Sequence, residues 1–325
     1  MATTVFRPGD RPLLNLGLFL LTVLTTFIAF RLMFADGLGS THPAVESLRF
    51  SLCLVAILGS HEMGHYLMAR RHGVDSSLPY FIPTPPLITF GTLGAVIRLR
   101  GRIPNRNALV DIGAAGPLAG LAVAIPVLIY GTATLKIIDT PLPVPQGALG
   151  PSSLVVALDH LWTWAQQLLL GAPPAGGEPT VAVTFFGDCL LTRGLKWLLL
   201  GPLPLGKDVQ ENGAYLAGWF GLLVTTLNLF PIGQLDGGHL THALFGERAV
   251  GVGRAAAGAL FGLVVVYSYT WALWFIITSL VLGFRHPPVM DPGPPLTGSR
   301  KLVCWLSFLA LALCLSPTPL TMVTG

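Results

Sequence analysis

The sequence is poor in charge: only 10% of its 325 residues are Asp, Glu, Lys or Arg, whereas an average soluble protein carries about 25%. Hydrophobic residues stand in their place and make up 52% of the chain. The mean hydropathy of +0.69 is typical of membrane proteins. This composition excludes an ordinary soluble domain. We expect a lipid bilayer around the protein and no nucleic acid among its partners.

Cysteine is also scarce. The four cysteines are scattered along the chain, and no two of them form a C-x-x-C pair. They are Cys53, Cys189, Cys304 and Cys314. The spacing indicates neither a disulfide framework nor a cysteine-bound metal, and we interpret these residues as small packing side chains.

A signal-peptide cleavage site is missing as well. Arg7 and Arg11 precede an apolar run, as basic residues do in a signal peptide. The run extends from Leu13 to Phe34, which is longer than a usual signal core, and no A-x-A site follows it. We therefore expect a retained first membrane span.

Long apolar runs are what the sequence has in abundance, and about 20 residues of helix cross the core of a bilayer. The 36-residue run Ala249–Phe284 would far exceed a bilayer as one helix, so we expect two spans with a break near Tyr267–Tyr269. The candidate spans are residues 13–34, 44–69, 108–135, 214–230, 249–266, 269–284 and 302–315. The sequence thus predicts an all-α polytopic membrane protein with about seven transmembrane helices, forming a single integral membrane domain over residues 1–325.

Two connections between the expected spans are long. Residues 73–107 contain five prolines, which forbid a continuous helix, and the β-formers of Thr89–Leu99 predict a short hairpin. Residues 136–212 are broken by Pro and Gly, and we expect amphipathic helices at 153–170 and 185–200 on the membrane surface. Either of these two helices could still cross the membrane.

The basic residues predict the orientation of the spans, because cytoplasmic loops carry the excess of Lys and Arg. Seven spans with a cytoplasmic N-terminus put every basic cluster on one side, and residues 136–212 then lie outside the cytoplasm. The basic clusters are Arg7 and Arg11, the six arginines of residues 70–106, Arg248 and Arg254, and Arg285, Arg300 and Lys301.

The second span contains the motif H-E-x-x-H, formed by His61, Glu62 and His65. Two histidines four residues apart lie on one face of a helix and can bind one zinc ion, with Glu62 beside them as a candidate general base. Two histidines and a glutamate are costly in an apolar segment unless they have a function. The motif lies toward the cytoplasmic end of its span.

A catalytic zinc needs a third protein ligand, and Asp236 is the best candidate. It follows the fourth span at a helix break made by Pro231 and Gly233, and the orientation brings it to the depth of His61 and His65. His239 and His242 are rival ligands, and His239 could instead orient a ligand.

Asn228 is another polar group expected at membrane depth. Its amide could bind a substrate carbonyl or stabilise an oxyanion. A hydrogen bond that packs two helices is an equally good interpretation from the spacing.

These motifs, in their order and spacing, resemble the site-2 protease family of intramembrane zinc metalloproteases. The residues that carry the resemblance are His61-Glu62-x-x-His65, the glycines of 113–120, and Asn228-x-x-Pro231-x-x-x-Leu235-Asp236-Gly237. The resemblance implies a three-helix catalytic core with one Zn²⁺ on His61, His65 and Asp236, and with Glu62 as the base. It also implies that Asn228 contacts substrate and that residues 89–100 form a membrane-associated β element. Residues 136–212 are too short and too broken for the PDZ domain that many members carry.

The expected activity is hydrolysis of peptide bonds within or near transmembrane segments of membrane-anchored proteins, as in regulated intramembrane proteolysis. The alternative is a divalent-metal transporter or channel, because intramembrane His and Asp also mark ion pathways. The low cysteine content and the lack of targeting features favour a bacterial inner membrane, with the active site toward the cytoplasm. A membrane of a eukaryotic organelle is the alternative.

Overall fold

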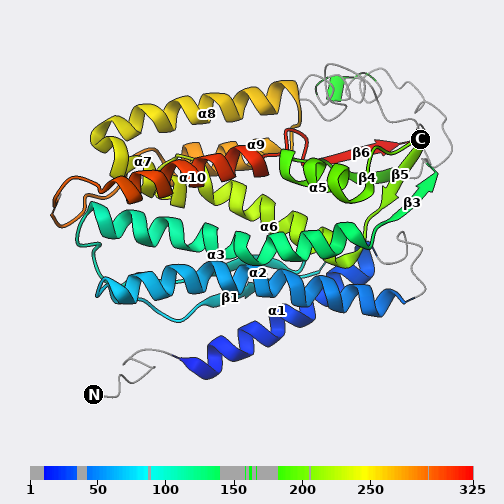
Figure 1. Ribbon diagram of the computed structural model, residues 1–325, viewed down its shortest axis with the longest axis horizontal. Helices are drawn as coiled ribbons and strands as arrows, with labels where there is room; N and C mark the ends of the chain where they lie inside the picture. Colours follow the sequence, from blue (N-terminus) through cyan, green and yellow to red (C-terminus); the bar gives the residue numbers. More distant parts are fainter. Residues whose placement is uncertain are drawn as a thin grey trace.

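The structure is a computed structural model that describes residues 11–34, 42–86, 89–139, 182–204, 206–291 and 293–324, with isolated positions between 158 and 166. It is mostly helical, and the long helices run roughly parallel to one another (Figure 1). The helices are α1 (Pro12–Met33), α2 (Pro43–Arg71), α3 (Arg106–Ala133), α5 (Leu190–Leu200), α6 (Gly213–Leu229), α7 (Asp236–Phe245), α8 (Ala249–Val266), α9 (Trp271–Ile276) and α10 (Gly298–Cys314). The 3₁₀ turn η1 (Gly246–Arg248) joins α7 to α8, and the π-helix η2 (Ile277–Leu282) extends α9.

The helical membrane class predicted from the sequence is confirmed. Within the described residues, four helical stretches are long and apolar enough to cross a bilayer, while α6 and Trp271–Leu282 are shorter apolar helices. Those four stretches are α1, α2, α3 and Asp236–Val266. The last of them turns at η1, so that α8 runs back over α7 (Figure 1). The count of seven spans stays a prediction.

The helices α2, α3 and α6 pack against one another and form the centre of the molecule. Their shared core contains Phe50 and Ile57 from α2, Leu128 from α3, and Leu216 and Leu222 from α6, all of them buried. Burial of such side chains stabilises a fold by about 1.5–3 kcal/mol each relative to water. The packing therefore gives α2, which carries the H-E-x-x-H motif, a rigid support on two sides.

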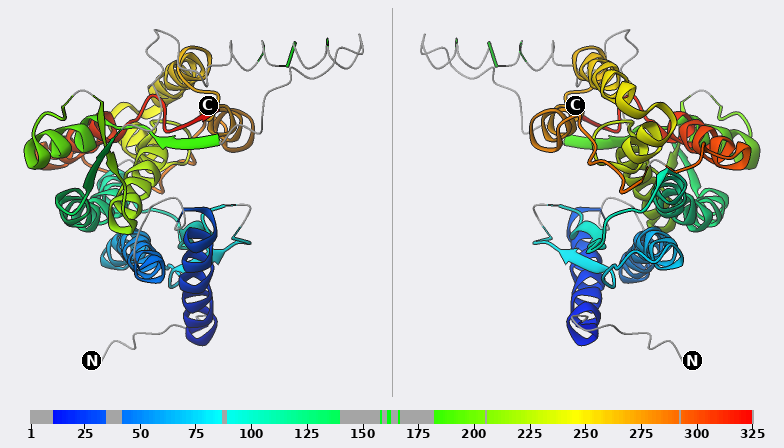
Figure 2. Two further views of the ribbon diagram at one scale, coloured as in Figure 1. Left: turned by 90° about the vertical axis from the view of Figure 1, so that its right-hand side faces the viewer. Right: turned by 90° about the vertical axis from the view of Figure 1, so that its left-hand side faces the viewer.

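A β hairpin lies beside α1, apart from the α8 side of the molecule (Figure 2). Strand β1 (Tyr80–Pro83) pairs with β2 (Thr92–Val96) in antiparallel register, with Phe81 opposite Ala95. The sequence predicted both strands within Thr89–Leu99, but the partner of β2 is β1, which ends at Pro83, before that stretch begins. A proline at the end of a short edge strand is tolerated, because it removes a donor only where pairing ends.

The hairpin is held by α1 through side-chain to backbone hydrogen bonds. Asn15 Nδ2 donates to the carbonyl of Pro79 at 2.7 Å, and Thr25 Oγ1 donates to the carbonyl of Gly91 at 2.7 Å. The ring of Phe19 meets Phe81 edge-on at 5.2 Å between centroids. These contacts satisfy backbone groups that lipid could not satisfy.

Two more strand pairs lie together at one end of the helices, on the right of Figure 1, and neither was predicted from the sequence. Strand β3 (Lys136–Asp139) pairs with β5 (Lys207–Gln210), and β4 (Ala182–Phe186) pairs with β6 (Leu320–Thr324). The helix expected at 185–200 therefore begins only at Leu190, with Cys189 as its N-cap. Nearly all of the helix expected at 153–170 lies outside the described residues.

The break after α6 places the residue that follows it. Helix α6 ends at Leu229, Pro231 lacks a backbone N–H, and Gly233 has a left-handed φ of +55°. Helix α7 begins at Asp236, and Asp236–Gly238 form its first turn. Asp236 is thus fixed at the N-terminal end of a helix, where a carboxylate is favoured.

Candidate metal centre

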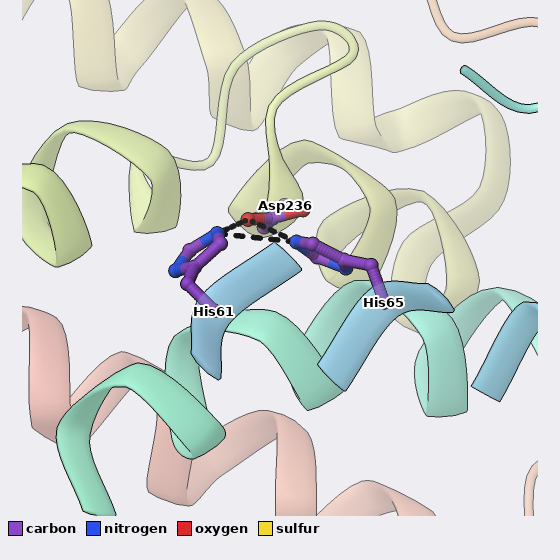
Figure 3. Close-up of side chains that lie close together, drawn as sticks. All are labelled: His61, His65 and Asp236. Atoms are coloured by element: carbon purple, nitrogen blue, oxygen red, sulfur yellow. Dashed lines mark hydrogen bonds and ion pairs between the residues drawn. The ribbon is translucent and has the colours of Figure 1, made fainter. Parts of the chain in front are cut away.

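Helices α2 and α7 bring His61, His65 and Asp236 together (Figure 3). The Nε2 atoms of His61 and His65 are 3.1 Å apart. Asp236 Oδ2 lies 3.4 Å from His61 Nε2 and 3.3 Å from His65 Nε2. The two histidines are only 4% and 8% exposed. Within the described part of the chain, this is the group of side chains that could hold a metal ion.

The three atoms fit a zinc site. Tetrahedral zinc with bonds of about 2.0–2.2 Å keeps its ligand atoms about 3.3–3.5 Å apart. The three separations, from 3.1 to 3.4 Å, lie in or close to that range. Two imidazoles and one carboxylate are also ligands that zinc prefers. Three protein ligands leave a fourth position for water or substrate, as in catalytic rather than structural sites.

The orientation of His65 is fixed from its other side. His65 Nδ1 donates to the carbonyl of Ile112 at 2.8 Å. A proton on Nδ1 leaves the lone pair of Nε2 free, and Nε2 is the atom that faces His61 and Asp236. Such a hydrogen bond commonly sets the tautomer of a metal-binding histidine.

Helix α3 leaves room for the histidine rings because glycines face them. A Cβ atom on Gly116 would overlap the ring of His65, and one on Gly120 would lie 3.3 Å from the Cβ of His61. Gly116 and Gly120 have a G-x-x-x-G spacing, which is typical of close helix packing. The structure adds that the space on α3 is filled by the side chains of the metal group.

Replacing Gly116 by Ala is therefore expected to displace the His65 ring and to lower zinc affinity by about 10–100-fold, the range found when a ligand loses its support. Zinc affinity would be measured by competition with a chelator. Gly258→Ala on α8 is the matched control, because its Cβ would meet nothing within 4 Å. Unchanged affinity in Gly116→Ala would contradict the packing described here.

Glu62 lies next to the metal group and is held by the hairpin. Its Oε2 accepts a hydrogen bond of 2.9 Å from the backbone N–H of Ile97, the residue after β2. Both residues line a cavity of about 550 Å³ that also contains His61, His65 and Asp236. The sequence pointed to Glu62, but it gave no signal for the contact with Ile97.

Asn228 reaches the same cavity from the last turn of α6. Its Nδ2 is 3.5 Å from His61 Nε2, at the long limit for a hydrogen bond. The structure thus places Asn228 beside the metal group, and a role in binding substrate stays a prediction.

The rival ligands lie elsewhere on α7. His239 lines the cavity, but its Nδ1 bonds to His286 Nε2 at 2.6 Å. His242 stacks on His286, with ring centroids 4.5 Å apart. Neither joins the group formed by His61, His65 and Asp236. The sequence did not point to His286, because a histidine 47 residues after His239 in a loop gives no local signal.

Comparison with known proteins agrees with this geometry. The model of peptidase family M50 matches residues 49–269. The chain belongs to this family. Membership confirms the resemblance to the site-2 proteases, and with it the metalloprotease class and zinc as the metal that the class implies.

Several of the curated relatives are plant proteins. The "Probable zinc metalloprotease EGY2, chloroplastic" of Arabidopsis thaliana is 26% identical over 276 residues, covering 83% of this chain and 42% of the relative. The protein of that name from Oryza sativa subsp. japonica is 30% identical over 281 residues, covering 85% and 44%. The "Probable zinc metalloprotease EGY1, chloroplastic" of Arabidopsis thaliana is 27% identical, covering 85% and 44%. The chain thus spans less than half the length of these relatives, and no solved structure matches it.

Proposed function

We propose that the chain is an intramembrane zinc metalloendopeptidase that hydrolyses peptide bonds within or near transmembrane segments of membrane-anchored proteins. The observation that carries the proposal is the zinc-compatible triangle of His61, His65 and Asp236 on apolar helices, with Glu62 beside it. A peptidase site that lies among membrane-spanning helices is accessible to substrates that are themselves embedded in the membrane. Family membership supports the chemistry.

Each residue has a definite task in this proposal. His61, His65 and Asp236 hold the metal, and bound zinc supplies a Lewis acid at the cavity. Glu62 takes a proton from the attacking water and delivers it to the leaving amine. The N–H of Ile97 keeps the carboxylate of Glu62 beside the ligands during both transfers. Asn228 supplies an amide N–H to the substrate carbonyl or the developing oxyanion.

Strand β2 provides a place for an extended substrate. Within the described residues β2 pairs with β1 alone, and Thr92–Val96 line the cavity of the metal group. A free strand edge can accept the backbone of a peptide as an added strand. A transmembrane helix must unwind before cleavage, and pairing with β2 would compensate the backbone groups that unwinding exposes.

We propose seven spans with a cytoplasmic N-terminus and an active site near the cytoplasmic face. Support comes from one end of the molecule, where α2 ends and α3 and α10 begin. There Asp111 accepts two hydrogen bonds from Arg300 and one from His72. Six arginines of residues 70–106 belong to the same end, which suits the cytoplasmic side.

The bacterial inner membrane is the location that we propose, as expected from the sequence. The relatives described above are named chloroplastic, so a chloroplast membrane is the competing location. Fractionation of the source cells, with antibodies against the chain, distinguishes the two.

The position of the cut tests the proposed function. Purified protein in liposomes, mixed with a panel of single-span membrane proteins, is expected to cleave at least one of them within or next to its transmembrane segment. Mass spectrometry of the products locates the cut. Soluble versions of the same proteins, which lack the segment, are the control. Cleavage confined to soluble regions far from the membrane would contradict the proposal.

A further inference from the structure

A second cavity lies at the turn between α7 and α8, where Gly238, Thr241 and His242 of α7 line it. This turn is on the left of Figure 1. Its volume is about 390 Å³, within the range of ligand sites in proteins. Its walls come from the break after α6, from α7, η1 and α8, and from the segment that follows η2. The loop that follows this segment joins the predicted cytoplasmic end, because Met290 N donates to the carbonyl of Ile103 at 3.1 Å.

Positive charge dominates the lining of this cavity. Arg254 and Arg285 line it, against the single carboxylate of Glu247. In the part of the chain that the structure describes, neither guanidinium has a hydrogen-bond or ion-pair partner. A third arginine, Arg106, lies against η1 at Gly246. The cavity therefore holds more guanidinium groups than carboxylates to neutralise them.

Arg254 lies in the apolar helix α8, where a charged side chain needs a partner or water. It is the one charged residue among the 18 of α8, a helix otherwise made of Ala, Gly, Val, Leu and Phe. An arginine in an apolar span is costly unless it reaches water or an anion. Here the side chain lies at a cavity that a second arginine shares.

His286 also lines the cavity, but its ring nitrogens are bonded within the protein, so the charged donors for a ligand are Arg254 and Arg285. His286 uses both ring nitrogens, because Nδ1 donates to the carbonyl of Pro287 and Nε2 faces His239 at 2.6 Å. Burial, followed by the nearby His242, lowers the pKa of His286 to about 4, so its ring is neutral near pH 7. A ligand would find its charged partners in the two guanidinium groups.

We propose that this cavity binds a phosphate-bearing anion, with Arg254 and Arg285 donating to the phosphate oxygens. A guanidinium presents paired N–H donors that match phosphate geometry, and such charge-assisted hydrogen bonds are the strong ones. The chemistry suits either the headgroup of an anionic phospholipid or a soluble phosphate compound. Both can reach a cavity at the end of a span.

The cavity shares its wall with the metal centre. Helix α7 carries Asp236 on its first turn and His242 further along, and His286 joins the cavity to His239 in the metal cavity. A bound anion would hold α8 and the segment after η2 against the helix that carries Asp236. Any effect on peptide hydrolysis rests on the proposed function, whereas binding itself does not.

Calorimetric titration of the full chain carrying Glu62→Gln tests the proposal, because binding is then read without peptidase activity. The probes are inorganic phosphate, a short-chain phosphatidylglycerol, and the matching diacylglycerol that lacks phosphate. We expect at least one phosphate probe to bind and the diacylglycerol not to. In Arg254→Gln/Arg285→Gln the affinity for that probe is expected to fall about tenfold or more.

The control is Arg98→Gln/Arg102→Gln, which removes two exposed arginines of the same end outside the cavity and is expected to keep the affinity within about twofold. Binding of phosphatidylglycerol alone assigns the site to a lipid headgroup, and binding of inorganic phosphate assigns it to soluble phosphates. If the Gln pair does not fold, Arg254→Lys/Arg285→Lys decides, since lysine keeps the charge but loses the paired donors. Absence of phosphate-dependent binding, or an equal loss in the control, overturns the proposal.

Discussion

Replacing Glu62 by Gln is expected to reduce cleavage of a membrane-anchored substrate by about 10²–10⁴-fold, the contribution of a positioned general base. Glutamine has nearly the same shape, and its amide oxygen can still accept the hydrogen bond from Ile97 N–H. It cannot take up a proton from water at neutral pH. The ligands His61, His65 and Asp236 are untouched, so zinc content is expected to stay at one ion per chain.

The measurement pairs turnover in liposomes with metal analysis of the same preparation. Asp139→Asn is the control, because its carboxylate is exposed at the opposite end of the molecule and pairs with Lys207. It is expected to keep wild-type turnover. Undiminished cleavage in Glu62→Gln would refute the mechanism. Zinc flux into liposomes that is equal in wild type and Glu62→Gln would favour the alternative of a metal transporter.

Replacing Asp236 by Ala is expected to lower zinc affinity by more than about 100-fold, beyond the effect of removing a supporting residue. Asp236 supplies the only negative charge among the three ligands, and an ion of charge +2 is poorly compensated without it in a medium of low dielectric constant. Loss of the third ligand also leaves two imidazoles on one helix. Peptidase activity should be lost together with the metal.

Zinc content after dialysis, measured by mass spectrometry, checks this expectation. His239→Ala and His242→Ala are the matched controls, because both residues lie on α7 and were rival ligands on sequence grounds. Both variants are expected to retain zinc. Retention in Asp236→Ala together with loss in His239→Ala would transfer the third ligand position to His239.

The sequence predicted those parts of the site in which a polar or charged residue stands in an apolar segment, because burying such a residue costs free energy unless it has a partner. His61 and His65 share a helix face by their spacing, and Asp236 is a carboxylate at a helix break in an apolar region, where charge needs a partner. The structure brings these three side chains together as expected. The membrane class followed from composition alone.

The parts that escaped prediction depend on contacts between distant segments. The partner of β2 is fixed by register across an eight-residue connection, and β4 pairs with β6 more than 130 residues later. No periodicity within one segment encodes such a pairing. The His239–His286 contact escaped for the same reason, as did the role of Gly116, whose missing side chain makes room for a ring on another helix.

The attachment of the hairpin to α1 bears on how much of the chain an active enzyme needs. The family match begins at residue 49, after α1 has ended. Yet Asn15 and Thr25 of α1 bind the backbone on both sides of the hairpin, and the hairpin in turn holds Glu62 through Ile97. A fragment limited to residues 49–269 would retain His61, His65 and Asp236. It would lose α1, which holds the hairpin that supports Glu62. We therefore expect the smallest active unit to extend beyond residues 49–269, which the family model matches, back to the first helix.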